Sequence, residues 1–220
     1  MAQPRPLFTF KVVVSAEADE AYAFHEQAAR ADAHIRPRSP SEIRTYAENN
    51  RLLGARRGNG GEFVGLCYSV LEMGRWEVGG LTVDDAAQGL GIGTLLVRLA
   101  VAHVLAFETP WSRGEKIIGH VHEANNEPRH ALERIGFERD GETELRPEDA
   151  PPSMKRNAQG KIIGDIYEFG PRGLKMLSNW FDQEFDGTLG RSNALVVVDL
   201  GYESIDDLRE TLRAMVQELL

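Results

Sequence analysis

A glycine-rich segment at residues 83–93, VDDAAQGLGIG, restricts the possible folds of this chain more than any other feature. It joins a strand-like run at residues 75–83 to a long apolar helix expected at residues 92–107. Glycine permits positive φ angles and close approach of the backbone to a ligand, and a helix N-terminus presents unpaired N–H groups to an anion. The sequence therefore predicts a phosphate cradle between a strand and a helix, with an ordinary tight turn as the alternative.

The hydrophobic periodicity before this segment predicts one strand, two helices and an antiparallel meander of three strands. The expected ranges are 7–14, 16–30, 41–48, 51–57, 62–73 and 75–83. Ser41 is expected to cap the second helix, because a serine hydroxyl accepts hydrogen bonds from the first turn. These elements form the first half of the expected fold.

After the glycine-rich segment, the pattern predicts a strand, a short helix and two strands that pair as a hairpin. Their ranges are 116–122, 125–135, from 137 onward, and 161–169, with a Pro-rich loop at 145–159 between the last two. The remaining residues predict a helix at 172–185, a strand at 194–200 and a helix at 204–220. We expect a main domain at residues 1–170 and an extension at residues 171–220, packed on the core or at a dimer interface.

Bulk properties exclude several classes of protein. The formal net charge of −9 argues against general nucleic-acid binding, which depends on cationic contacts to phosphate. The chain contains no apolar run of the roughly 20 residues that a membrane span needs, and no signal-peptide pattern follows Met1, so we expect a cytoplasmic protein. The single cysteine, Cys67, excludes an intramolecular disulfide and a multi-cysteine zinc site, and is expected in the core.

Spacing separates the known phosphate-binding motifs. The P-loop needs Lys-Ser or Lys-Thr after its last glycine, which this segment lacks. The Rossmann fingerprint needs a third glycine where Thr94 stands, and its strand opens a βαβ unit instead of closing a meander. The pattern Q/R-x-x-G-x-G/A matches at Gln88, Gly91 and Gly93. Here the sequence resembles the GCN5-related N-acetyltransferases (GNAT), whose defining loop binds the pyrophosphate of acetyl-CoA.

The order of expected elements resembles the same family over about residues 7–170. The resemblance implies an α/β fold with a mixed, mostly antiparallel split sheet flanked by helices, here followed by the helix-strand-helix extension. It also implies direct transfer of an acetyl or other acyl group from acyl-CoA to a primary amine in a ternary complex, without a metal. The amine acceptor would be a small molecule or a peptide, and a homodimer is possible.

The family's cofactor contacts are carried over onto matching positions of this sequence. Backbone amides of the glycine-rich loop would hold pyrophosphate, main-chain groups of the preceding strand would meet the pantetheine arm, and the first residue of the helix at 125–135 would contact CoA near its sulfur. For that last residue, capping of its own helix is an equally good explanation. The residues implied are Leu81, Thr82, Val83, Gln88, Gly89, Leu90, Gly91, Ile92, Gly93, Thr94 and Asn125.

Amine acylation also needs a group that accepts a proton. Glu77 lies eleven residues before Gln88, and a glutamate at that spacing is the general base in histone-acetylating members of the family. His120 and His122 alternate with Val121, so they share one face of their strand and are candidates for a proton relay. Hydrogen-bonded strand histidines and deprotonation through water are the alternatives.

One position departs from the family pattern. The family often has a tyrosine seven residues after the matching asparagine, where it protonates the departing thiolate, but this chain has Leu132. Solvent, Tyr68 or His130 would then supply the proton, or catalysis would be weak. The second hypothesis is therefore a catalytically weak or inactive module that binds acyl-CoA.

Overall fold

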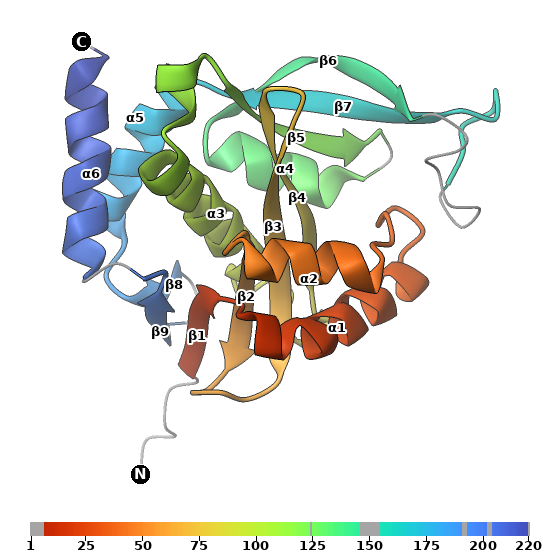
Figure 1. Cartoon of the computed structure of the whole chain (residues 1–220), viewed down its shortest axis with the longest axis horizontal. Helices are drawn as coiled ribbons and strands as arrows, with labels where there is room; N and C mark the ends of the chain where they lie inside the picture. Colours follow the sequence, from red (N-terminus) through yellow and green to blue (C-terminus); the bar gives the residue numbers. More distant parts are fainter. Residues whose placement is uncertain (1–6, 124, 146–154, 191–192, 202–203, 220) are drawn as a thin grey trace.

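The computed structural model describes residues 7–123, 125–145, 155–190, 193–201 and 204–219 (Figure 1). The order of helices and strands is β1 (Leu7–Val12), α1 (Ala18–Ala31), α2 (Pro40–Glu48), β2 (Leu52–Arg57), β3 (Phe63–Glu72), β4 (Arg75–Val83), α3 (Ile92–Glu108), β5 (Lys116–His122), α4 (Asn126–Arg134), β6 (Phe137–Leu145), β7 (Ile162–Phe169), α5 (Pro171–Asn179), β8 (Thr188–Leu189), β9 (Ala194–Asp199) and α6 (Ile205–Glu218). Short 3₁₀ turns lie at η1 (Ser15–Glu17), η2 (Asp85–Ala87) and η3 (Pro110–Arg113), and a π-helical turn at η4 (Trp180–Glu184).

The described strands form a single sheet in the order β6-β7-β5-β4-β3-β2-β1-β9-β8. The pairs β4–β5 and β1–β9 are parallel and the others are antiparallel. The mixed, mostly antiparallel sheet flanked by helices is therefore confirmed, as are the meander of β2, β3 and β4 and the β6–β7 hairpin.

Helices cover the two faces of the sheet in two separate groups (Figure 1). Side chains of α1 and α2 pack on one face, in a cluster that includes Tyr46, Leu66 and Tyr68. The apolar helix α3 and the short helix α4 pack on the other face, in the main core with Cys67 and Trp76. Alternation along a strand thus decides which helical layer each side chain meets.

Strands β4 and β5 diverge after a short parallel contact. Their pairing joins Arg75 to Lys116, Trp76 to Ile117 and Glu77 to Ile118, and no further pair follows although both strands continue. On its other side, β4 bulges against β3, since Gly79 pairs with Tyr68 and Thr82 pairs with Leu66. A bulge leaves extra residues outside the regular ladder, so Gly80 and Leu81 line the open side of the split.

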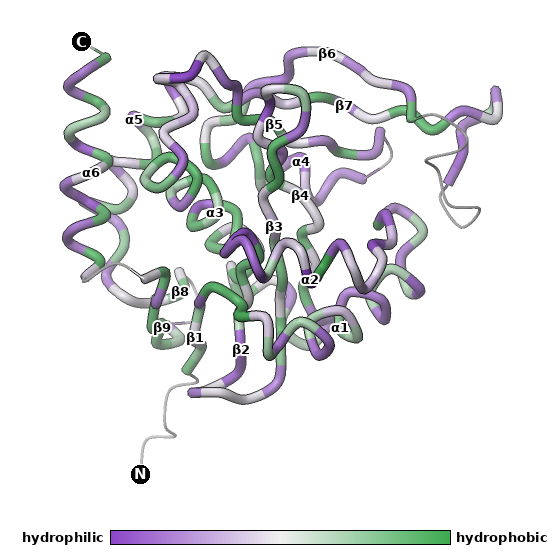
Figure 2. Tube along the Cα trace, viewed as in Figure 1, coloured by the Kyte–Doolittle hydropathy of each residue, from purple (hydrophilic) through white to green (hydrophobic). Residues whose placement is uncertain are grey.

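The C-terminal part of the chain continues the sheet instead of forming a separate body. Strand β9 pairs in parallel with β1, and Leu208 and Leu212 of α6 are fully buried in the core with α3. Figure 2 shows the alternation of hydrophobic and hydrophilic residues along α6 that this one-sided packing requires. A domain boundary at residue 170 and a role of this segment in a dimer stay predictions.

Three local expectations need correction. Helix α2 is capped by Ser39, whose hydroxyl accepts from Glu42 N at 3.2 Å, and not by Ser41; Pro40 occupies the first helical position, where its fixed φ suits a helix start. The helix expected at 172–185 ends at Asn179 and continues as the π-helical turn. The two-residue strand β8 was not expected, because so short a strand carries no periodic pattern.

The Pro-rich loop expected at 145–159 lies largely outside the described residues. Its described end contacts the segment between α1 and α2, where Lys155 N donates to the carbonyl of Ala33 at 3.2 Å.

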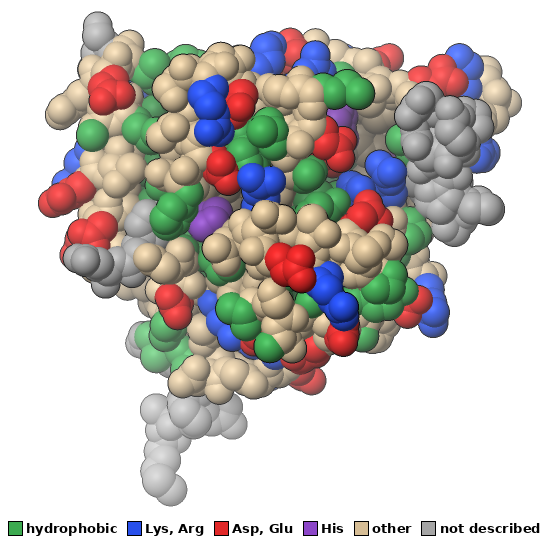
Figure 3. Space-filling view, in the orientation of Figure 1, with side chains coloured by type: hydrophobic (Ala, Val, Ile, Leu, Met, Phe, Trp, Pro, Cys, Tyr) green, Lys and Arg blue, Asp and Glu red, His purple; other side chains and the backbone are tan. Residues whose placement is uncertain are grey.

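On the molecular surface, Figure 3 shows acidic and basic side chains interspersed over one face. None of the helices in the described part of the chain is long and apolar enough to cross a membrane.

Candidate active site

Glu77 and His120 meet at the point where β4 and β5 separate. Nδ1 of His120 donates to Oε2 of Glu77 at 3.2 Å, although the two residues lie 43 positions apart in the sequence. A carboxylate can only accept, so Nδ1 carries the proton and Nε2 of a neutral His120 presents a lone pair. The two strands therefore build a carboxylate–imidazole pair with one basic nitrogen left available.

The surroundings of Glu77 keep its carboxylate ionised. Burial acts to raise the pKa of Glu77, but the hydrogen bond from His120 and the positive charges near it outweigh burial and lower the pKa below the usual range. Nη2 of Arg38 is one such charge, 4.0 Å from Oε1. A carboxylate with a lowered pKa is a weak proton acceptor, and is better suited to orient His120.

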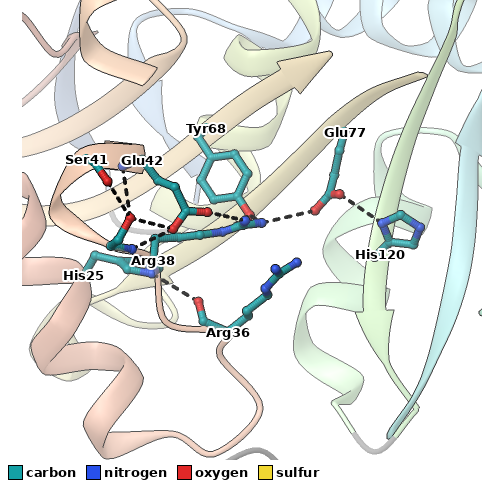
Figure 4. A network of polar contacts seen from close by, with 9 residues as sticks. His25, Arg36, Arg38, Ser41, Glu42, Tyr68, Glu77 and His120 are labelled. Atoms are coloured by element: carbon teal, nitrogen blue, oxygen red, sulfur yellow. Dashed lines mark hydrogen bonds and ion pairs between the residues drawn. The ribbon is translucent and has the colours of Figure 1, made fainter. Parts of the chain in front are cut away.

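Arg38 connects this pair to the neighbouring helix and strand (Figure 4). Its Nε donates to the hydroxyl of Tyr68 at 3.0 Å, Nη2 donates to the same oxygen, and Nη1 donates to Oε1 of Glu42 at 3.0 Å. The side chain is 5% exposed. Arg38 is thus a buried cation whose Nε, Nη1 and Nη2 all donate hydrogen bonds, which fixes the segment after α1 against the site.

A cavity of about 100 Å³ crosses the sheet through the gap between β4 and β5. One end is lined by Asn125, Pro128 and Leu132, which belong to the α4 side, and the other end by His34 and Arg36, which precede α2. Tyr68, Gly79, Gly80, Leu81 and His120 line the passage between them. A molecule bound on the α3–α4 face can therefore meet, within the gap, a second molecule that enters from the α1–α2 face.

His122 lies on the same face of β5 as His120 but has different neighbours. Its Nε2 lies 2.9 Å from the carbonyl of Lys155, and its ring meets that of His34 edge-on with 5.0 Å between ring centres. The expectation that both histidines share one face is confirmed. His122 belongs to the wall of the cavity and is not bonded to Glu77.

The glycine-rich loop has the geometry of an anion cradle. Gly89 and Gly91 adopt φ angles of +74° and +93°, which strongly favour glycine. The first main-chain hydrogen bond of α3 runs from Leu95 N to Gly91 O. The N–H groups of Ile92, Gly93 and Thr94 therefore have no hydrogen-bond partner within the helix. A negatively charged group placed here would find free donors and the positive end of a helix of 17 residues.

Other residues expected to contact the cofactor divide into two groups. Gln88 and Leu90 lie in the loop, where the Gln88 side chain donates to Oδ1 of Asp85 at 2.9 Å and its main-chain N to Asp85 O at 3.3 Å. Leu81, Thr82 and Val83 continue from the bulge to the loop, and the Thr82 hydroxyl is buried without a hydrogen-bond partner in the described parts of the chain.

Asn125 precedes α4 and lines the cavity, and its side chain makes no capping hydrogen bond to that helix. Asn125 thus occupies the N-cap position of α4 without a capping hydrogen bond from its side chain, and its contact with CoA stays a prediction.

Leu132 stands at the position where the family often has a tyrosine that protonates the departing thiolate. Here the side chain makes apolar packing contacts instead. It is buried and packs on Gly119 of β5, where the Cβ atom of any larger residue would lie 2.9 Å from Leu132 Cδ1. Tyr68 does line the cavity, but burial, and next the charge of Glu77, raise the pKa of its hydroxyl well above the usual range. His130 is exposed on α4.

Sequence reasoning missed Arg36 and Arg38. Their segment, Arg-Pro-Arg-Ser-Pro, reads only as a break between helices, and no spacing rule connects it to a strand glutamate some forty residues later. A tertiary contact alone brings them to the site.

Among the residues that the structure describes, no group of three or more His, Cys, Asp or Glu side chains is placed to hold a metal ion.

The sequence profile of the acetyltransferase (GNAT) family matches residues 16–137, more than half of the chain. This chain belongs to the GNAT family. As a GNAT protein it is an acetyltransferase, and acetyl-CoA is the co-substrate of its family. Comparison with the curated protein sequences gave no match.

Solved structures show the same GNAT fold. The chain is similar to Arabidopsis thaliana NAA60 in complex with a bisubstrate analogue, at 12% identity and a TM-score of 0.55, covering 74% of this chain and 97% of that one. It is also similar to a ribosomal-protein-alanine N-acetyltransferase from Brucella melitensis, at 16% identity and a TM-score of 0.53, covering 72% and 97%. An N-acetyltransferase from Staphylococcus aureus Mu50 matches at 13% identity and a TM-score of 0.52, covering 73% and 96%.

Proposed function

We propose that this GNAT protein transfers the acetyl group of acetyl-CoA directly to a primary amine in a ternary complex. The observation that carries the proposal is the gap between β4 and β5, with Glu77 and His120 at its apex and one cavity lined by residues from both faces of the sheet. Two substrates that approach from opposite faces need no covalent enzyme intermediate. Cys67, fully buried and with a pKa raised to about 12 by burial, is not available as a nucleophile.

The chain's own residues fit acetyl-CoA along one continuous path. The amides of Ile92, Gly93 and Thr94 would hold the pyrophosphate, and the bulged backbone of Gly80 and Leu81 would meet the pantetheine arm in the gap. Adding a side chain at Gly91 would place a substituent in the cradle at a φ of +93°. Acetyl-CoA supplies the activated thioester, and the protein supplies its position.

We assign the proton transfer to Nε2 of His120. As the amine nitrogen bonds to the acyl carbon and the carbon–sulfur bond breaks, the proton of the amine passes to this nitrogen. Glu77 holds the other ring nitrogen and its negative charge stabilises the imidazolium that forms. Glu77 is thus a positioning residue in this proposal.

The departing thiolate receives its proton from solvent in this scheme. Leu132 has no proton to give, and the raised pKa of Tyr68 makes that hydroxyl a poor acid. A thiol has a pKa of about 8.5 in water, so the thiolate is a fair leaving group without a dedicated acid. The apolar Leu132 also favours the second candidate function, a module that binds acyl-CoA with little or no catalysis.

Calorimetric titration with acetyl-CoA tests the cofactor site. We compare the wild type with Gly91→Glu and with Gly74→Glu, a matched control that places the same residue at a φ of +74° in the turn at the other end of β4. Micromolar binding lost only in Gly91→Glu supports the cradle. A folded wild type that binds neither acetyl-CoA nor longer acyl-CoAs contradicts it.

Thiol release in the presence of amines then separates the two candidate functions. Turnover that depends on the amine supports the transferase. Tight binding of acetyl-CoA without turnover by any amine supports the binding module instead.

A further inference from the structure

Arg36 is a cation at the acceptor end of the cavity, and its guanidinium has no partner in the part of the chain that the structure describes. Its guanidinium extends toward the space between Arg38 and His120 (Figure 4) and makes no hydrogen bond or ion pair with another described residue. The main-chain carbonyl of Arg36 is engaged separately, 3.3 Å from Nε2 of His25. The residue is half-buried and lines the cavity. Arg38, two positions later, differs in this respect because Tyr68 and Glu42 occupy its donors.

The local charges leave Arg36 free to bind an anion. Glu77 already faces His120 through one oxygen and Arg38 through the other, and Glu42 is bonded to Arg38. The charge of Arg36 reaches Glu77, where it helps to lower the pKa, but no direct contact joins the two. A guanidinium presents five donors in a planar fork that matches a carboxylate.

The phosphates of acetyl-CoA cannot be this anion. Arg36 lies beside the Glu77 end of the gap, and Val83, where β4 meets the glycine-rich loop, lies six positions after Glu77. At about 3.3 Å per residue, this separation is roughly 20 Å. An anion that reaches Arg36 therefore arrives with the acceptor, from the α1–α2 face.

A second unsatisfied polar atom lies in the same wall. Nδ1 of His34 is bonded to Oδ1 of Asp32 at 2.8 Å, while Nε2 is buried without a hydrogen-bond partner among the described residues. Buried polar atoms are nearly always paired, so an unpaired one in a cavity wall is available to a bound molecule, either a ligand group or a water. The acceptor end thus offers a basic nitrogen at His120, a cationic fork at Arg36 and an unpaired nitrogen at His34.

We infer that the acceptor is an amine that carries a carboxylate on the same small molecule, as an α-amino acid does. Its amino group meets Nε2 of His120, and its carboxylate binds the guanidinium of Arg36. This inference rests on the proposed transfer to an amine. It adds the class of acceptor and the residue that selects it.

The test measures thiol release with the twenty L-α-amino acids, each beside its own carboxamide, which keeps the amine but has no negative charge. The wild type is expected to use its best amino acid with a kcat/KM about 10- to 100-fold above that of the matching amide, the usual worth of a hydrogen bond to a charged group. Arg36→Met removes this preference through KM for the acid and leaves the amide unchanged. Arg36→Lys restores part of it, because lysine keeps the charge but not the fork.

Arg30→Met is the matched control, since Arg30 is an exposed arginine on α1 paired with Glu26. It should leave the preference for the acid as in the wild type. Equal use of acids and amides by the wild type overturns the inference, and so does an equal loss on both substrates in Arg36→Met, which would indicate an effect through Glu77. No thiol release with any member of the panel also overturns the inference, whereas the proposed function is overturned only when other primary amines, including peptides, give no thiol release either.

Discussion

Replacing Glu77 with Gln removes the negative charge beside His120 and keeps the size and shape of the side chain. The side chain of Glu77 is 19% exposed, and its carboxylate lies 3.2 Å from Nδ1 of His120, whose side chain is 33% exposed. Gln can still accept the hydrogen bond from Nδ1. The substitution therefore isolates the electrostatic stabilisation of the imidazolium that forms during proton transfer.

The distance and the exposure give the expected magnitude. Two unit charges 3.2 Å apart interact with about 5 kcal/mol at an effective dielectric constant of about 20, and with about 1.3 kcal/mol in bulk water. Because His120 is one-third exposed, the real contribution lies between these limits, at roughly 2–3 kcal/mol. At about 1.4 kcal/mol for each factor of ten, kcat should fall roughly 30- to 150-fold in Glu77→Gln.

Steady-state thiol release with acetyl-CoA and the best amine acceptor measures this loss. His120→Gln should lose about 10²- to 10⁴-fold, the range of general acid–base catalysis. The double variant should be no slower than His120→Gln, because Glu77 acts through His120. Glu168→Gln is the control: it removes a carboxylate paired with Lys116 at 2.5 Å on the adjoining strand and should leave kcat unchanged.

Two results would refute this reasoning. Wild-type activity of Glu77→Gln would show that the pair does not take part in proton transfer. Losses that multiply in the double variant would show that Glu77 acts independently of His120, as a base in its own right.

The remaining predictions concern packing and reactivity. Gly80→Ala should lower the free energy of unfolding by about 2–5 kcal/mol in urea denaturation, because Cβ would lie 2.1 Å from Tyr68 Cε1 at a φ of +60°. Gly114→Ala, with φ at +69° and open space around it, should lose only about 1–2 kcal/mol, and equal losses would exclude the steric cause. The thiol of Cys67, buried with a pKa of about 12, should react with a disulfide reagent at pH 8 only after unfolding; labelling of the native protein would contradict this burial.

Much of the fold was predictable because it depends on local pattern. The alternation along β2, β3 and β4, the apolar helix α3 and the glycines that need positive φ are written in neighbouring residues. The shared face of His120 and His122 follows from the two-residue period of a strand. The family likewise follows from a short motif, at Gln88, Gly91 and Gly93, in its place between a strand and a helix.

Local pattern failed where two signals compete within a few residues. Ser39 and Ser41 are both suitable caps, and the position of Pro40 in the first turn decides between them. Strand β8 contains two residues and depends on its pairing with β9, so it has no signal of its own.

The candidate site itself required the tertiary structure. The sequence by itself determined that the chain has a glycine cradle before α3, a strand glutamate and two strand histidines. Only the tertiary structure decided that β4 and β5 separate just after Glu77, that this carboxylate meets His120, and that Arg38 is engaged while the guanidinium of Arg36 has no partner among the described residues. The physical reason is that a helix or strand is set by neighbours along the chain, whereas charges interact through space and meet only once distant strands have paired.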